Sequence, residues 1–151
     1  MQKNVCCFIG HRTIIETDEM KKRLLNEIEN LIKDKNVDTF LFGSKSQFDS
    51  LCLDLVTRLK ERYPHIKRIY IRAEYPVISE DFKEYLLKIY DETYFPEKII
   101  GAGKASYVKR NYEMIDKSNY CVFYYMQLNR KSGTKIALDY AVKHEKKIIF
   151  I

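Results

Sequence analysis

The feature that most constrains the fold is the alternation of short apolar runs with amphipathic segments along the 151 residues. The apolar runs have the length of strands and are rich in β-branched and aromatic residues; they occupy residues 4–9, 37–42, 66–72, 120–125 and 148–151. Strands that are apolar throughout are typical of a parallel sheet covered on both faces. The pattern therefore predicts an α/β protein of three layers.

The amphipathic segments predict helices between these strands. Thr17 is suited to cap a helix whose first turn holds two acids, and apolar residues then recur at helical spacing, at Met20, Leu24, Ile28, Leu31 and Ile32. A second helix is expected from Phe48 to just before Pro64, and two more at residues 105–116 and 135–144.

The middle of the chain, residues 73–103, is the least regular part. It predicts a short helix at residues 81–90, an irregular excursion at 91–96, a small extra strand at 98–100 and a turn at 101–103. Its tyrosines and phenylalanines have two interpretations: they cover the base of a ligand, or they pack against the sheet.

Composition narrows the class of protein. The chain is 46% hydrophobic and 32% charged, which is typical of one globular domain, and no apolar run reaches membrane-spanning length. The N-terminal apolar run is too short for a signal peptide, so we expect a cytoplasmic protein that does not contact a membrane. The four cysteines lack metal or redox spacing, so we expect no metal and buried free thiols at Cys6, Cys7, Cys52 and Cys121.

The charge balance favours an anionic partner. The net charge is +6 and the isoelectric point lies near 9.0, which suits a phosphorylated ligand or a nucleic acid. A lysine-rich solvated surface explains the same numbers.

Three turns of small residues follow predicted strands or open predicted helices: Gly10-His11-Arg12, Gly43-Ser44 and Ser132-Gly133-Thr134. In a parallel sheet these turns meet at the carboxyl ends of the strands, where ligands bind. A turn that opens a helix aims free backbone N–H groups and the positive helix end at one point, which is how proteins hold phosphate. The sequence therefore predicts a phosphate-type site at this edge.

Individual side chains near these turns have alternative roles. Arg12 either pairs with phosphate or is a surface arginine, and His11 is either a general acid or base or a hydrogen-bonded structural histidine. Asp49 either caps the second helix or contacts a ribose hydroxyl. Thr134 is expected to cap its own helix.

The order of the motifs resembles the SLOG superfamily, which is named from the DNA-processing protein DprA (Smf) and the LOG phosphoribohydrolases. The likeness covers nearly the whole chain and is greatest to its small bacterial YpsA-like branch. It rests on Gly10-His11-Arg12, Phe42-Gly43 with Phe48-Asp49, Arg110-Asn111 with Met114, and Ser132-Gly133-Thr134. The resemblance implies a Rossmann-like fold with a mostly parallel sheet of five or six strands in a single domain, residues 1–151, that binds a nucleotide-derived ligand without a cofactor.

The resemblance also implies roles for particular residues. The turn at Gly43 would approach the ligand closely, Asp49 would contact the ribose or backbone, and Arg110, followed by Asn111, would face phosphate or ribose. Residues 132–134 would form a shortened phosphate loop. LOG-type enzymes carry a catalytic glutamate three residues after the threonine of that loop, and here that position is Ala137.

Three functions follow from these observations. The first is a module that binds a nucleotide or nucleotide sugar, such as an ADP-ribose-like ligand, in signalling or regulation. The alternative is a nucleotide N-glycosidase of phosphoribohydrolase type, with unknown catalytic residues, for which the candidate glutamates are Glu16, Glu74 and Glu113. The third is single-stranded nucleic-acid binding, favoured by the basic balance and the 12 tyrosines. The family and the tyrosines also suggest a homodimer.

Overall fold

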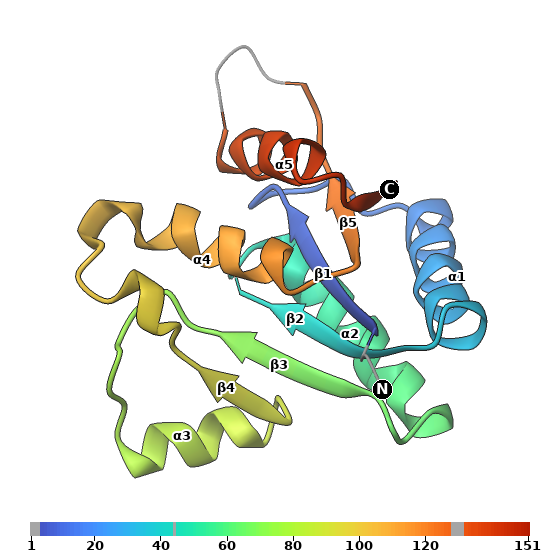
Figure 1. Cartoon of the computed structure of the whole chain (residues 1–151). Helices are drawn as coiled ribbons and strands as arrows, with labels where there is room; N and C mark the ends of the chain where they lie inside the picture. Colours follow the sequence, from blue (N-terminus) through green and yellow to red (C-terminus); the bar gives the residue numbers. More distant parts are fainter. Residues whose placement is uncertain (1–3, 44, 128–131) are drawn as a thin grey trace.

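A six-stranded sheet, parallel throughout, forms the centre of the computed structural model, which describes residues 4–43, 45–127 and 132–151 (Figure 1). The strands are β1 (Asn4–Gly10), β2 (Val37–Phe42), β3 (Lys67–Ile71), β4 (Glu92–Tyr94), β5 (Tyr120–Tyr124) and β6 (Lys147–Phe150). The helices are α1 (Asp18–Asp34), α2 (Gln47–Arg62), α3 (Glu80–Leu87), α4 (Ser106–Asp116) and α5 (Gly133–Lys143), with 3₁₀ turns η1 (Glu97–Ile99) and η2 (Gly103–Ala105). The predicted α/β fold of three layers is confirmed.

The strand order β4-β3-β2-β1-β5-β6 creates a switch point in the middle of the sheet. The chain adds strands in one direction from β1 to β4 and then crosses over, so that β5 pairs with the other side of β1. In open α/β sheets such a reversal separates the loops that leave the two central strands and opens a crevice between them. The crevice is therefore expected beyond the ends of β1 and β5.

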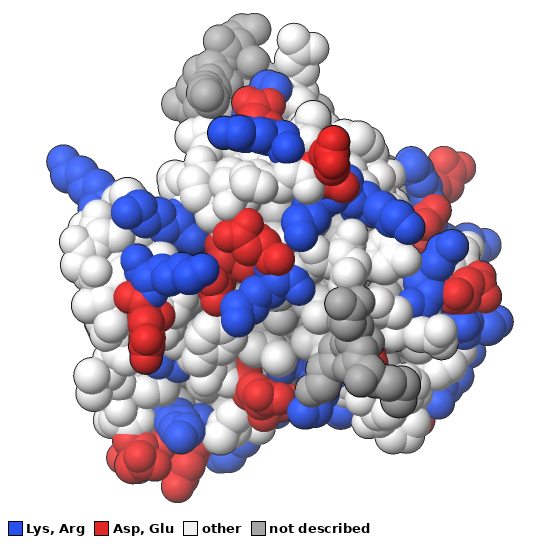
Figure 2. Space-filling model, in the orientation of Figure 1, with Lys and Arg blue, Asp and Glu red and all other residues white. Residues whose placement is uncertain are grey.

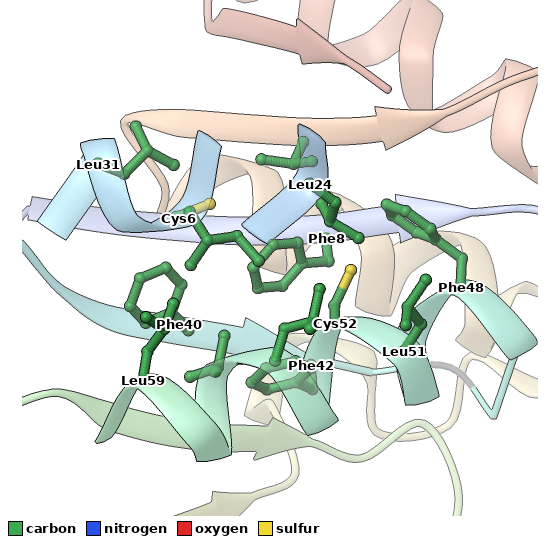
Figure 3. Packing of buried hydrophobic residues seen from close by; sticks show 14 of the residues in the cluster. Cys6, Phe8, Leu24, Leu31, Phe40, Phe42, Phe48, Leu51, Cys52 and Leu59 are labelled. Atoms are coloured by element: carbon green, nitrogen blue, oxygen red, sulfur yellow. The ribbon is translucent and has the colours of Figure 1, made fainter. Parts of the chain in front are cut away.

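One face of the sheet packs against α1 and α2. Phe8 of β1 stacks on Phe40 and Phe42 of β2, with ring centroids 5.8 and 5.3 Å apart, and Leu24 of α1 and Phe48 of α2 close the layer (Figure 3). All five side chains are at most 1% exposed. Each such burial contributes about 1.5–3 kcal/mol of transfer free energy, so this layer holds much of the stability.

The opposite face packs against α4 and α5 (Figure 1). Its buried cluster includes Cys7 of β1, Met114 of α4 and Leu138 of α5, whereas Cys6 lies in the cluster on the other face. Consecutive residues of a strand point to opposite faces, which explains the division. All four cysteines are buried and free, as predicted.

The extra strand is not where the sequence predicted it. Residues 98–100 were expected to form it, but residues 97–99 form the 3₁₀ turn η1, and the strand β4 lies at residues 92–94 within the predicted excursion. Pro96 begins the turn, since its ring fixes φ and removes an N–H donor. β4 is three residues long and depends on pairing with β3, a contact that local sequence does not reveal. In the described part of the chain, no helix is long and apolar enough to cross a membrane.

Candidate functional site

A cleft of about 1070 Å³ lies where the three predicted turns meet, beyond the carboxyl ends of the central strands. Its volume lies just above the usual range for small-molecule sites, about 300–1,000 Å³. Of the eleven residues predicted from sequence, nine line it: Gly10, His11, Arg12, Gly43, Arg110, Asn111, Ser132, Gly133 and Thr134. Ser44 lies outside the described residues, and Asp49 is beside the cleft but does not line it.

Two helices begin at this cleft, α2 and α5. Ser46 Oγ accepts a hydrogen bond from the Asp49 N–H at 3.0 Å, and Ser132 Oγ accepts one from the Lys135 N–H at 3.1 Å. The caps are therefore Ser46 and Ser132, and the predicted capping roles of Asp49 and Thr134 are wrong. The cap residue precedes the helix and bonds an N–H three residues on, so the first-turn N–H groups and the positive helix ends are directed at the cleft.

The two glycines of these turns have different surroundings. A Cβ at Gly43 would lie 2.6 Å from Met114 Sδ and 2.7 Å from Arg110 Cδ, whereas a Cβ at Gly133 would meet no atom of the described residues within 4 Å. The close approach that the structure shows at Gly43 is that of helix α4, and the approach of a ligand to this turn stays a prediction. Gly133 is the position that leaves open space beside a helix N-terminus.

Arg110 lines the cleft and also connects two strand ends from a buried position. It is 3% exposed, and its Nη1 donates to the carbonyl of Gly43 and, at 3.5 Å, to that of Ile71, so it joins the ends of β2 and β3. Its Nε donates to Asn111 Oδ1 at 3.0 Å. Burial lowers the pKa of Arg110, while Asp49 opposes that change. Backbone carbonyls therefore engage part of the guanidinium, while Arg110 still lines the cleft, and its role toward phosphate or ribose stays a prediction.

Asp49 lies beneath the cleft as a buried acid. It is 3% exposed, and its Oδ1 has no hydrogen-bond partner in the described residues. Burial raises the pKa of Asp49, and the charge of Arg110 and the Gly43 N–H oppose the rise. A ribose contact through Asp49 is therefore not built into this conformation.

His11 connects the two strands of the switch point. Its Nε2 accepts a hydrogen bond from the Met126 N–H at 2.8 Å, which ties the residues after β1 to those after β5. This bond supports the structural interpretation of His11. Arg12, the next residue, is exposed and lines the cleft.

Several lining residues were missed from the sequence. Lys45 adds a cation, and Tyr70, Tyr107 and Met126 complete the far side and the rim. Only the abundance of tyrosine gave a signal, and the position of these residues depends on the loops after β3 and before α4.

The three candidate glutamates are separated by their positions. Glu74 lines the cleft. Glu113 lies elsewhere on α4, where it accepts a hydrogen bond from Tyr94 Oη at 3.0 Å, and Glu16 accepts one from Gln47 Nε2 at 2.8 Å. Glu74 is therefore the one acid among the described residues that line the cleft.

The fold and the cleft define a class: Rossmann-like α/β proteins with a crevice at the carboxyl edge of a parallel sheet. Two solved structures of the molybdenum cofactor carrier protein of Chlamydomonas reinhardtii have this fold, with TM-scores of 0.56 and 0.58 at 16% identity. The alignments cover 100% and 99% of this chain and 77% and 76% of theirs.

The chain belongs to the family of the uncharacterized SPbeta prophage-derived protein YoqJ of Bacillus subtilis (strain 168). The two are 33% identical, over 83% of this chain and 81% of that protein. No protein-family model matches the sequence. Membership of the SLOG superfamily stays a prediction.

Proposed function

We propose that this chain is a binding module of the SLOG type that holds a small phosphorylated molecule, a nucleotide or nucleotide sugar, in the cleft. The observation that carries the proposal is the convergence of two helix N-termini with the cations Arg12, Lys45 and Arg110, whereas Glu74 is the one acid that lines the cleft among the described residues. Helix N-termini and cations favour a bound anion. A role of this binding in signalling or regulation is part of the same proposal.

The fold neighbours support small-molecule binding in general. By name, the two solved structures are of a carrier of the molybdenum cofactor. A scaffold of this kind therefore serves a carrier elsewhere, although at 16% identity the ligand does not transfer.

Thermal stabilisation by a panel of AMP, ADP, ADP-ribose and NAD tests the proposal. A ligand at a hundred times its Kd should add about 2.7 kcal/mol of stability. Arg12→Ala should weaken the response, whereas Arg58→Ala, an exposed arginine of α2 away from the cleft, should not. A wild-type protein that no ligand stabilises, or an Arg12 variant that responds normally, would refute it.

The enzyme alternative now depends on one residue. Ala137 is 1% exposed and faces the sheet, so the LOG-type catalytic position lies in the core. Glu74 is the acid that reaches the cleft, and a glycosidase would require it. Chromatography of each stabilising ligand for a released base, with wild type and Glu74→Gln, tests this: base released by both proteins, or by neither, removes Glu74 as the catalyst.

Single-stranded DNA belongs in the same panel. Figure 2 shows lysine and arginine interspersed with acidic residues on the viewed face, rather than a continuous basic stripe. Stabilisation by DNA alone, lost steeply with salt, would favour the nucleic-acid function instead.

A further inference from the structure

The cleft has two chemically different ends. At one end lie the turn after β1 and the N-termini of α2 and α5, with Arg12 and Lys45. At the other end lie Tyr70 near the end of β3, Glu74 in the loop that follows it, and Tyr107 on α4. Since β3 is two strands from β1 and three from β5, the ends are separated by about 10–14 Å at a spacing of about 4.8 Å per strand. A bare phosphate fills one end only, and a nucleoside phosphate spans both.

Glu74 is positioned and has acceptor capacity left. Tyr107 Oη donates a hydrogen bond to Glu74 Oε1, and Oε2 has no hydrogen-bond partner in the part of the chain that the structure describes. An ionised carboxylate accepts only, through two oxygens with about four lone-pair sites. Glu74 can therefore accept two neighbouring donors side by side while Tyr107 orients it.

Flat aromatic surfaces flank this carboxylate. Tyr107 is 50% exposed, and its ring centroid lies 5.8 Å from the Arg110 guanidinium carbon. Tyr70 stacks on Tyr90 with ring centroids 5.0 Å apart and an angle of 18° between the rings. Aromatic rings and a carboxylate together suit a planar ring with N–H donors on its edge, and they disfavour a second phosphate.

We propose that this end of the cleft binds a heteroaromatic ring, and that Glu74 accepts hydrogen bonds from two adjacent N–H donors on its edge. Resting on the proposed function, this names the ligand class: a phosphorylated molecule with the 2-amino-4-oxopyrimidine edge that guanine and the pterins share. That edge presents an amide N–H beside an amino group and matches a carboxylate bidentately. Adenine has acceptors beside its amino group, which a carboxylate repels.

Isothermal titration of wild type and Glu74→Gln with ribose 5-phosphate, IMP and GMP tests the inference. IMP lacks the 2-amino group of GMP, so wild type should bind GMP about tenfold to a hundredfold more tightly, the usual effect of a hydrogen bond to a charged group. Glu74→Gln should lose that preference. The same variant should bind ribose 5-phosphate at least as tightly as wild type, because it removes a negative charge from the cleft.

Two further variants separate recognition from a structural role. Glu61→Gln makes the same change at an exposed site on α2 and should leave all three affinities unaltered. Tyr107→Phe keeps the ring but removes the donor that orients Glu74, and it should reduce the preference for GMP in part. 7,8-Dihydroneopterin monophosphate, titrated beside GMP, distinguishes the two sources of the edge: Glu74-dependent binding of either one supports the inference.

The outcomes distinguish the two proposals. If wild type binds ribose 5-phosphate through Arg12 but does not prefer GMP or the pterin, the inference about Glu74 is wrong and the proposed function stands. A Glu74→Gln variant with the wild-type preference is equally decisive against it. If wild type binds no phosphorylated compound, the proposed function fails and the inference fails with it.

Discussion

Replacing Gly43 by alanine should destabilise the fold by overpacking, although it removes no hydrogen bond. The added Cβ would lie 2.6 Å from Met114 Sδ and 2.7 and 2.8 Å from Arg110 Cδ and Nε, so Met114 would have to retreat by about 0.8 Å to reach an ordinary contact of 3.4 Å. Neither side chain has room. Met114 is 1% exposed, and the carbonyls of Gly43 and Ile71 hold Arg110.

Overpacking of this kind costs about 1–3 kcal/mol. For a chain of this length each kcal/mol lowers the melting temperature by about 2–4 °C, so we expect a fall of roughly 4–8 °C for a middle value of 2 kcal/mol. Calorimetry and urea unfolding measure the change. Ligand affinity should also fall, since Arg110 moves with the strain.

Gly133→Ala is the matched control, because its Cβ meets no atom within 4 Å among residues 4–43, 45–127 and 132–151, and its backbone does not require glycine. The variant should have the melting temperature of the wild type but should bind phosphate more weakly, because the added methyl group enters the cleft. In a Met114→Ala background, Gly43→Ala should cost less than in wild type, because part of the clash is gone. If Gly43→Ala has the melting temperature of the wild type, or loses the same stability in both backgrounds, the close approach of α4 is not the reason for glycine at this position.

Three further predictions concern stability, each checked by urea unfolding. Burial raises the pKa of Asp49, so the wild type loses stability as the pH rises from the unfolded pKa of about 3.9 through the native pKa. Over that pH range the stability of Asp49→Asn relative to wild type should increase by up to about 1.4 kcal/mol per pH unit, and a difference that stays constant with pH contradicts this. For Asp91, burial acts to raise the pKa, but the hydrogen bonds from Arg68 outweigh it, so that the native pKa is lowered. Asp91→Asn should therefore reduce stability at neutral pH, and this loss should shrink as the pH falls below about 4. Leu24 is fully buried, so Leu24→Ala should cost about 2–5 kcal/mol, and a smaller loss would mean that α1 packs loosely.

The layers of the fold were predictable because each strand and helix carries its own pattern. The central strands β1 and β5 are apolar along nearly their whole length, and the stripe from Met20 to Ile32 identifies one face of α1. β4 was misplaced because three residues at an edge carry no such pattern and depend on the neighbouring β3. Local sequence predicts a strand or helix that has its own apolar pattern, and it does not predict a short strand whose formation depends on pairing with a neighbouring strand.

The candidate site was predictable in outline for the same reason. Parallel strands deliver their turns to one edge, so Gly10, Gly43 and Gly133 could be grouped without a structure. The direction of side chains on α4 could not be, because an arginine on a helix is usually solvated and Arg110 instead enters the gap between two strand ends. Glu74 lies in the irregular segment after β3 and Tyr107 in the first turn of α4, and only the folded chain brings them together.

The four thiols are divided between the two faces of the sheet, so their reactivity can report separately on the opening of each helical layer. Cys6 and Cys52 lie in the layer with α1 and α2, and Cys7 and Cys121 in the layer with α4 and α5. All four are shielded from solvent, and burial raises the pKa of Cys6 and Cys52, so a thiol reagent in solution reacts only after a layer has separated. Labelling followed by mass spectrometry would then time the exposure of each layer separately. Equal rates at all four sites would mean that the sheet loses both covers in one step, and unequal rates would show which cover leaves first.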